Sequence, residues 1–535
     1  MNKIAQYLNK HLVGEVTTDP QIIKKHSTDG SILTISPDMV MYPMVTNDVR
    51  KATRFAWQLA EKGHTLSITP RGSGSDRTGG AIGKGVVVSF PTHMRHIYEY
   101  DAKQKLVRLQ PGVSISALLG ALSLYGTSVP GLRLLPPSRT VGGAVSSMRA
   151  AGDYVKQLEV VLSNGDVLQT KKLSKRELSR KKGLQTFEGD IYRQVDALIE
   201  DYADVIAEKC DIEHAEHAGY FALADVKQKD GSFDLTPLFI GSQATLGIIS
   251  EMIVKAEYIN QNPAIIAIAF NELDSAYDAI EAAEKIQPSS LEFIDGSYFE
   301  VAKAAGKEFS FYEQARQNGD VEAVIVATFD DFNERARARK LKKFVKIAKP
   351  LGGVVDQAID ESVSELHAVR TVTSFTLTPS THDASTPPLI DGLYVPVDRF
   401  EEFSARAQGI ASKHHVELSF YGHPLDGHWS ARPQVKLGTV TGKQTSMKLI
   451  SEIALLARQH EGTLFGEMGE GRLRTVAAKQ MLDPELQTMF QEVKDIFDPH
   501  GILNRGVKVG TNPQELGKQL RSDFSASLTG ELPRH

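Results

Sequence analysis

The sequence has almost none of the residues that build covalent cross-links or metal–sulfur clusters. Its 535 residues include a single cysteine, Cys210. One thiol excludes an internal disulfide, a CxxC redox pair and an iron–sulfur cluster held by cysteines. We therefore expect Cys210 to be a small buried core residue, in a protein suited to a reducing cytoplasm.

Long apolar runs and an excess of positive charge are also missing. The apolar run 264–270 has the length of a buried strand and is far too short to span a bilayer. Residues 1–13 are amphipathic without the apolar region of a secretory signal, so we expect no leader there. The net charge of −5 gives no reason to expect a nucleic-acid partner. The charge run 334–343 is expected to be a solvated helix face.

What remains is an ordinary globular composition, 41% apolar and 24% charged, in a chain long enough for two or more domains. We expect a helix and approach segment over 1–35, domains over 36–259 and 260–507, and a polar tail over 508–535. In the first domain the clearest elements are a helix near 47–62, begun by a Thr46/Asn47 cap signal, and a hairpin over 158–170.

The second domain has a different pattern of secondary-structure elements. Strands are expected near 265–270, 321–329, 393–397 and 417–421, and helices near 273–286, 331–348, 400–413 and 446–459. This alternation, with antiparallel pairing, predicts an α+β domain whose helices cover one face of a sheet.

The most distinctive stretch is the glycine-rich segment 69–81, between expected strands over 64–68 and 85–90. It lacks the third glycine of a dinucleotide-binding fingerprint, and no Walker-type Gly-Lys-[Ser/Thr] follows. Its glycines permit positive φ and leave the backbone open to a ligand. A row of exposed N–H groups binds anions such as a diphosphate, with Arg71, Ser73, Ser75 and Thr78 as further donors. The alternative is an ordinary turn.

Two later loops have the same character, and together the three resemble a known family. Segments 136–145 and 241–249 both carry glycines where a backbone can touch a ligand. Segments 70–80, 136–143, 241–249, 288–295 and 497–506 match, in order, motifs of FAD-linked oxidoreductases with the vanillyl-alcohol oxidase/p-cresol methylhydroxylase fold. The chain is most similar to their D-lactate dehydrogenase/glycolate oxidase subunit type. Gln243, Ala244 and Arg505 depart from those motifs.

The resemblance implies an α+β protein: an FAD-binding PCMH-type domain followed by a ferredoxin-like α+β FAD-linked oxidase C-terminal (cap) domain. It implies bound FAD, and the first loop has no histidine for a covalent link to the flavin. The residues expected to bind FAD are Arg71, Gly72, Ser73, Gly74, Ser75, Gly79, Gly80, Pro137, Ser138, Thr140, Gly142, Gly143, Gly247, Ile248, Ile249 and Asn504.

The motifs that carry the family's substrate chemistry are altered. The segment 422–430 keeps His423, but the second metal-ligand histidine of the family is Ser430. In 466–472, Glu467 is kept, whereas the histidine that resembles the family's proton acceptor is Met468. A thioether cannot take a proton from a hydroxyl. His428 is therefore a metal ligand, a base or an ordinary hairpin-tip histidine.

A metal site for Zn²⁺ or Mn²⁺ would then consist of His423, His428 and Glu467. Arg370 matches an arginine that grips the substrate carboxylate in the family, and with His423 and His428 it completes the expected catalytic set. The added carboxylate of Glu470 is expected to be a surface charge.

The resemblance implies FAD-dependent oxidation of a 2-hydroxy acid, similar to D-lactate, to the 2-oxo acid by hydride transfer to flavin N5. The electron acceptor would be a quinone, a cytochrome or a flavoprotein. The alternatives are a metal-free alcohol or sugar oxidase on the same fold and a non-catalytic flavin-binding protein. We expect a cytoplasmic protein without a transmembrane segment, and a peripheral position at a membrane stays open.

Overall fold

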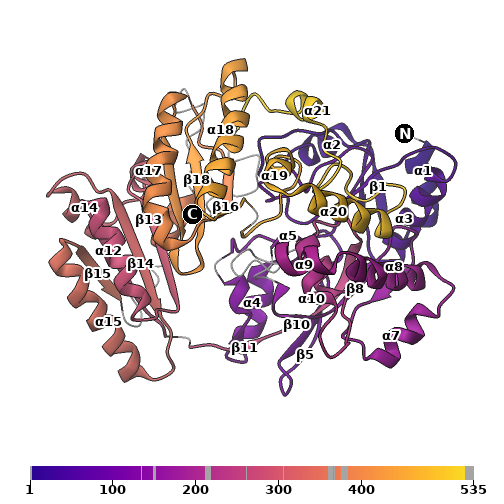
Figure 1. Ribbon diagram of the computed structural model, residues 1–535, viewed down its shortest axis with the longest axis horizontal. Helices are drawn as coiled ribbons and strands as arrows, with labels where there is room; N and C mark the ends of the chain where they lie inside the picture. Colours follow the sequence, from indigo (N-terminus) through magenta and orange to yellow (C-terminus); the bar gives the residue numbers. More distant parts are fainter. Residues whose placement is uncertain are drawn as a thin grey trace. The chain divides into compact units, whose positions relative to one another are not determined.

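The computed structural model describes residues 3–133, 135–148, 152–210, 219–260, 262–304, 306–358, 366, 368–374, 384–464 and 466–524. The chain divides into two compact units (Figure 1). The first unit combines Met1–Glu257 with Phe465–Arg521, and the second contains Tyr258–Leu464. The C-terminal stretch from Phe465 to Arg521 therefore groups with the first unit. Each unit is described by itself.

The first unit is built on two sheets. One has the order β1-β2-β4-β3, and β4 pairs with both β2 and β3 in parallel. Its strands are β1 (Glu15–Thr17), β2 (Met39–Tyr42), β3 (Ile68–Arg71) and β4 (Val86–Ser89). Because residues 69–71 lie in β3, in register with β4, the glycine loop begins at Gly72 and not at Thr69.

The second sheet has the order β5-β6-β10-β8-β9 and contains the predicted hairpin as its last two strands. Its strands are β5 (Ile97–Asp101), β6 (Leu106–Leu109), β10 (Ile248–Lys255), β8 (Val155–Val161) and β9 (Val167–Gln169). The short strands are β7 (Thr127–Ser128) and β11 (Glu257–Tyr258). The chain turns between β8 and β9 at Gly165, whose φ of 83° suits glycine.

The first unit also holds many helices. They are α1 (Lys3–His11), α2 (Pro20–His26), α3 (Thr46–Ala60), α4 (Ile115–Ser123), α5 (Val141–Ser147), α7 (Lys175–Lys182), α8 (Phe187–Asp201), α9 (Ala203–Lys209), α10 (Leu223–Val226), α11 (Thr236–Phe239), α19 (Thr475–Met481), α20 (Pro484–Phe497) and α21 (Pro513–Lys518). The start of α3 is fixed by Asp48 and not by Thr46 or Asn47, because the buried Asp48 carboxylate accepts the N–H groups of Val13 and Met44.

Two other expectations for this unit have clear outcomes. Cys210 is fully buried, and burial raises the pKa of its thiol to about 12, so the core role is confirmed. The C-terminal segment is more than a polar tail, because Leu516 of α21 and Leu520 are buried. Residues 525–535 lie outside the described residues.

The second unit is a seven-stranded antiparallel sheet with the order β15-β12-β14-β13-β17-β18-β16. Its strands are β12 (Ala264–Phe270), β13 (Ser290–Asp295), β14 (Ala323–Phe329), β15 (Val354–Ala358), β16 (Ile390–Tyr394), β17 (Leu418–His423) and β18 (His428–Pro433). Its helices are α12 (Leu273–Glu284), α13 (Ser297–Ala304), α14 (Ser310–Arg316), α15 (Glu334–Ala348), α17 (Val397–Lys413) and α18 (Val440–Gln459). The predicted strands and helices of this domain all form, with ends shifted by a few residues.

The expectation that helices cover only one face of this sheet is wrong. All seven residues of β12 are buried. Alternate β12 residues from Ile265 pack in one core with Phe299 of α13 and Phe311 of α14, while α12 and α15 contact β12 and β14. A strand that is apolar on both faces needs cover on both faces. None of the helices in the described part of the chain is long and apolar enough to cross a membrane.

Candidate functional site

The three glycine loops meet around one cavity in the first unit. The cavity encloses about 690 Å³ of empty space, part of it open to solvent. The predicted residues that line it are Arg71, Gly72, Ser73, Gly74, Ser75, Gly80, Thr140, Gly142, Gly143, Ile248 and Ile249. Segments that lie far apart in the sequence therefore form a single site, at the end of β3, the start of α5 and the start of β10.

The first loop offers a row of unengaged donors to this cavity. Within the described residues, no acceptor is assigned to the backbone N–H groups of Ser73, Gly74, Ser75 and Asp76, all of which line the cavity. The hydroxyls of Ser73 and Ser75 lie 3.0 Å apart. Consecutive N–H groups that face one cavity form an anion-binding nest, which suits a diphosphate.

Asp76 gives the loop its shape. Its Oδ1 accepts hydrogen bonds from the Thr78 N–H at 2.8 Å, the Thr78 hydroxyl at 2.8 Å and the Gly80 N–H at 2.9 Å. The carboxylate therefore satisfies donors on the far side of the turn and leaves the N–H row before it for a ligand. The sequence analysis missed Asp76, although an aspartate within a glycine-rich loop is a common signal for such a side-chain-to-backbone turn.

Arg71 supports the loop from behind. Its Nη1 donates to the carbonyl oxygens of Thr28 at 2.9 Å and Ala81 at 3.2 Å, and a Cβ on Gly74 would collide with its guanidinium. Burial lowers the pKa of Arg71, while Asp29 and Asp76 favour its charged form. Arg71 thus lines the cavity as predicted, but it donates to the backbone that builds the loop.

Asp29 lies fully buried beneath the same loop. Its Oδ1 accepts the N–H of Ser31 at 3.0 Å and its Oδ2 accepts the N–H of Ala81 at 3.3 Å. Burial raises the pKa of this carboxyl to about 6, and the nearby Asp76 charge adds to the shift. The loop therefore rests on a carboxyl that titrates close to neutral pH.

The first and second loops touch each other through glycine. A Cβ on Gly72 would collide with the Thr140 side chain, and a Cβ on Gly142 would collide with Pro111. Arg139, in the same segment, lines the cavity and donates to Ser147 Oγ at 2.9 Å and Met148 Sδ at 3.3 Å. Sequence reasoning passed over Arg139 because it occupies a spacer position of the motif.

The third loop contributes an unusual backbone. Gln243 and Ala244, both lining the cavity, have φ values of 51° and 57°. Gln243 joins two other segments, since its Nε2 donates to Thr78 Oγ1 at 3.1 Å and its Oε1 accepts the Gly471 N–H at 2.8 Å. Two consecutive non-glycine residues in the left-handed region are uncommon and mark strain at a ligand-binding loop.

Some predicted cofactor residues lie outside the lining. The Gly79 carbonyl accepts a hydrogen bond from Arg472, and a Cβ on Gly247 would collide with Val160. Pro137 and Ser138 are exposed in the turn that precedes α5. These residues shape the loops instead of bordering the cavity.

Asn504 ties two loops together from the C-terminal segment. Its Nδ2 donates to the carbonyls of Gly80 at 2.9 Å and Gln243 at 2.7 Å, and its Oδ1 accepts from Arg472 at 3.1 Å. Burial lowers the pKa of this arginine to about 10. The motif around Asn504 therefore positions the first and third loops relative to each other.

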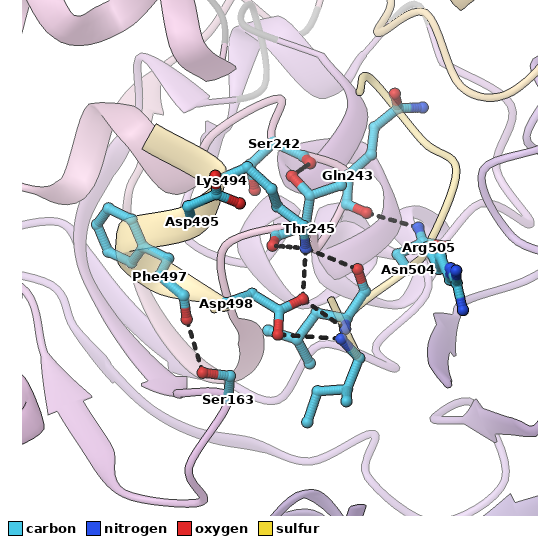
Figure 2. A network of polar contacts seen from close by, with 12 residues as sticks. Ser163, Ser242, Gln243, Thr245, Lys494, Asp495, Phe497, Asp498, Asn504 and Arg505 are labelled. Atoms are coloured by element: carbon cyan, nitrogen blue, oxygen red, sulfur yellow. Dashed lines mark hydrogen bonds and ion pairs between the residues drawn. The ribbon is translucent and has the colours of Figure 1, made fainter. Parts of the chain in front are cut away.

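A buried ion pair holds that motif in place (Figure 2). Lys494 Nζ donates to Asp498 Oδ2 at 2.5 Å and to the carbonyls of Thr245 at 2.7 Å and Leu503 at 2.9 Å. Asp498 in turn accepts the N–H groups of Ile502 at 3.0 Å and Leu503 at 2.7 Å. Burial lowers the pKa of Lys494, and the adjacent carboxylate opposes that shift.

The segment with the altered proton-acceptor motif also reaches the cavity lining. Met468 pairs with Met148, and the Gly469 N–H donates to the Ser147 carbonyl at 2.9 Å. Glu470 does not carry the expected surface charge: it is buried and its Oε2 lies 2.5 Å from Lys508 Nζ. Its cationic partner lies 38 residues further along the chain, so local sequence gave no sign of the pair.

In the second unit, the altered histidine motif is a tight hairpin. His423 ends β17 and His428 begins β18, where the two residues are cross-strand partners. Gly427 turns the chain with a φ of 65°, and Trp429 anchors β18 by donating from Nε1 to the Val395 carbonyl at 3.1 Å. His428 is largely buried, with its ring 6.2 Å from that of Tyr394. Alternation along the strand places His428 and Ser430 on the same face.

Arg370 lies elsewhere in the second unit, in a 3₁₀ turn over Arg370–Ser374. Its Nε is 2.5 Å from Glu292 Oε1, and its Nη2 donates to Ser290 Oγ at 3.0 Å and Thr328 Oγ1 at 2.6 Å. The guanidinium is thus oriented by β13 and β14, and among the described residues no acceptor is assigned to its Nη1. Sequence reasoning did not reveal the contact between Arg370 and Glu292.

The expected metal ligands do not form one cluster within a unit. His423 and His428 belong to the second unit and Glu467 to the first. In the described ranges of the chain, no group of three or more histidine, cysteine, aspartate or glutamate side chains is arranged to hold a metal ion. Within the second unit, the expected ligands therefore provide two histidine side chains on one hairpin.

Comparisons with known proteins agree with the two-part organisation. Residues 37–171 match the model of an FAD binding domain, and residues 259–507 match that of FAD linked oxidases, C-terminal domain. The structure is similar to that of p-cresol methylhydroxylase with substrate bound, with a TM-score of 0.66 at 12% identity over 95% of this chain and 97% of the other. This likeness concerns the fold alone.

Two relatives illustrate the range of sequence similarity. A D-2-hydroxyglutarate dehydrogenase of Pantoea ananatis is 24% identical over 90% of this chain and 48% of its own length. Glycolate oxidase subunit GlcD of Bacillus subtilis is 25% identical over 88% of both chains. The chain thus spans about half the length of the first relative and most of the second.

Proposed function

The chain belongs to the FAD-linked oxidases of the p-cresol methylhydroxylase fold, and from this premise we propose that it oxidises a 2-hydroxy acid with bound FAD. The observation that carries the proposal is the cavity bordered by three glycine loops, where the first loop presents a row of backbone N–H groups to which no acceptor is assigned among the described residues. The names of the two relatives, a D-2-hydroxyglutarate dehydrogenase and a glycolate oxidase subunit, support this substrate class.

The residues of the cavity fit the cofactor. The N–H row from Ser73 to Asp76 would hold the diphosphate, with Arg139 at the border of the cavity as a positive charge. Since no histidine lies in the first loop, the cofactor would be held without a covalent histidyl bond. When bound, FAD supplies the two-electron acceptor for the hydride from the substrate carbon.

The protein supplies substrate orientation and a base. Arg370 would hold the substrate carboxylate through Nη1, because Glu292, Ser290 and Thr328 fix the other edge of its guanidinium. His428 would take the hydroxyl proton, since Met468 cannot. His423, its cross-strand partner, would bind the substrate hydroxyl.

A metal remains the rival account of the same histidines. Zn²⁺ or Mn²⁺ held by His423, His428 and Glu467 would suit the nitrogen and oxygen donors. The described residues contain no group of three ligands arranged to hold a metal ion. The roles assigned above to Arg370, His423 and His428 use no metal. D-lactate is the first substrate to test, followed by glycolate and D-2-hydroxyglutarate.

The test begins with the purified protein. It should be yellow, and acid precipitation should release all of the colour into the supernatant. Anaerobic addition of D-lactate, glycolate or D-2-hydroxyglutarate should then bleach the flavin bands. L-lactate, which has the opposite configuration to D-lactate, is the control. If only an alcohol, a sugar or an alkylphenol bleaches the flavin bands, the substrate belongs to that class and not to the 2-hydroxy acids. Flavin that no substrate reduces would indicate a binding protein, and a colourless protein that cannot be reconstituted would contradict FAD.

A further inference from the structure

Helix α15 carries a stripe of positive charge along its outer face. The exposed cations of the segment 334–349 are Arg335, Arg339, Lys342, Lys343, Lys346 and Lys349. Four of them, Arg335, Arg339, Lys342 and Lys346, follow the spacing i, i+4, i+7 and i+11, which aligns side chains on one side of a helix. The opposite side, with Phe344, is buried against the sheet of the second unit.

Within the part of the chain that the structure describes, these four cations are not neutralised by acidic side chains. Among the described residues, no acidic side chain is assigned to any of them, whereas Lys340 on the inner side pairs with Asp331 at 2.8 Å. The basic helix α7 of the first unit differs in part, since Lys181 pairs with Glu188 and Lys182 with Asp196. The other exposed cations in and just before α7 likewise have no assigned ion-pair partner among the described residues: Lys172, Lys175, Arg176 and Arg180. Like charges one helical turn apart repel each other, so an unpaired row needs an external anion to be favourable.

An exposed aromatic side chain stands at the start of the stripe. Phe332, two residues before α15, has 71% of its surface exposed. The helix has 15 residues, which corresponds to a length of about 22 Å. The row itself, from Arg335 to Lys346, extends over about 16 Å of the helix. A straight cationic row of this length, near one exposed ring, matches an anionic lipid surface that all four charges reach at once and into which the ring can insert.

We propose that α15 docks the second unit on an anionic membrane surface, with Arg335, Arg339, Lys342 and Lys346 at the lipid headgroups and Phe332 inserted between them. Because the chain as a whole carries a net charge of −5, attraction to an anionic surface must come from a local cationic patch such as this row. This inference is independent of the proposed oxidation, because it uses no residue of the cavity, of the hairpin or of the Arg370 site.

The experiment is co-sedimentation of the full chain with vesicles. One set contains phosphatidylcholine only, and the other contains about 30% phosphatidylglycerol, which supplies the negative surface potential. Binding is measured at about 0.1 M salt, where charges act over about 10 Å, and at about 1 M, where the range falls to about 3 Å. We expect binding to the anionic vesicles at low salt that is at least about tenfold tighter than to neutral ones and is lost at high salt.

Two quadruple variants locate the surface. R335Q/R339Q/K342Q/K346Q should weaken binding to anionic vesicles at least about tenfold, since each cation near an anionic lipid surface adds to the attraction. K172Q/K175Q/R176Q/R180Q removes four exposed charges at α7 and should change binding less than about twofold. Phe332→Ser should weaken binding while its salt dependence persists. Both quadruple variants must retain the thermal midpoint of the wild type.

Three outcomes would overturn the proposal. The first is equal binding of the wild type to neutral and anionic vesicles. The second is an equal loss in both quadruple variants, which would mean that net charge and not α15 governs binding. The third is no vesicle binding together with tight, α15-dependent retention of an oligonucleotide or of an acidic protein, which would assign the stripe to another partner.

Discussion

The cavity of the first unit and the histidine hairpin of the second are stabilised in different ways. Around the cavity, buried charges such as Asp29, Arg71 and Lys494 fix the loops through hydrogen bonds to the backbone. The hairpin is closed by a glycine turn and by the packing of Trp429. The cofactor end should therefore couple binding to stability and pH, whereas the hairpin should tolerate polar changes that alter only turnover.

The sharpest test of this difference is His428→Asn. A general base contributes typically 10²- to 10⁴-fold to a rate, so we expect turnover of a bleaching substrate to fall by about that factor. Because asparagine fills less space at the tip of a hairpin anchored by Trp429, FAD content and the thermal midpoint should stay near those of the wild type. Rapid-mixing measurements of flavin reduction give the rate.

EDTA distinguishes the base from a metal ligand in the same experiment. Wild-type turnover that survives EDTA, together with an inactive His428→Asn variant, supports the base. Turnover that EDTA abolishes and Zn²⁺ or Mn²⁺ restores supports the metal. A variant that loses FAD or unfolds would contradict the proposed separation between the two regions.

The second prediction concerns the buried ion pair at the cavity. Lys494→Met leaves the Asp498 carboxylate buried without its cation, and breaking a buried pair costs about 3–5 kcal/mol. We expect denaturant unfolding to show that loss, accompanied by loss of FAD. Lys209→Met is the matched control: its ion pairs with Asp483 and Glu485 are partly exposed and screened by solvent, so it should change the unfolding free energy far less. If the two variants lose equal unfolding free energy, the network in Figure 2 has no special role in stability.

The contrast also explains which parts of the site the sequence revealed. Glycines at motif spacing marked the three loops, because close backbone approach permits no other residue, as Gly72 against Thr140 shows. The residues that hold those loops were not marked, because Asp76 and Arg139 occupy spacer positions. In the second unit, the clear alternation of strand and helix patterns predicted almost all of the strands and helices.

Long-range ionic contacts were beyond sequence reasoning. Glu470 was expected to be a surface charge because Lys508 becomes its partner only when the C-terminal segment folds back. Arg370 matched a carboxylate-binding position, yet its contact with Glu292 depends on where β13 lies. The charge run over α15 was expected to be a solvated face, and only its alignment on one side, without acidic partners, suggested a surface for anionic lipids.

The third prediction tests the close contact between the first two loops. Gly72→Ala places a methyl group against the Thr140 side chain, and such overpacking costs typically about 1–3 kcal/mol. The loss should appear in FAD affinity and in the unfolding of the first unit. Gly120→Ala is the control, since this helical glycine in α4 has no neighbour within 4 Å of an added Cβ. It should stabilise by up to about 1 kcal/mol.

The fourth prediction is the pH response of Asp29. Its pKa is raised to about 6 from 3.8, so the folded state binds the proton more tightly than the unfolded state does. The burial penalty is therefore present above pH 6 and is relieved as pH falls through 6. Between pH 7 and pH 5 the wild type should gain on the order of 1 kcal/mol relative to Asp29→Asn, in which this titration is absent. If the unfolding free energies of the wild type and of Asp29→Asn change in parallel with pH, Asp29 does not titrate in this range.

The smallest expected effect concerns the strained third loop. Ala244 has a φ of 57°, where a side chain costs about 1–2 kcal/mol that glycine avoids. Glycine loses about 0.5–1 kcal/mol through its greater freedom in the unfolded chain, so Ala244→Gly should stabilise by about 0.5–1 kcal/mol in denaturant unfolding. The control is Ala282→Gly in α12, an ordinary helical position that should lose about 1 kcal/mol. Opposite signs for the two substitutions would show that the loop stores backbone strain, and a loss in both would show that Ala244 rests there without cost.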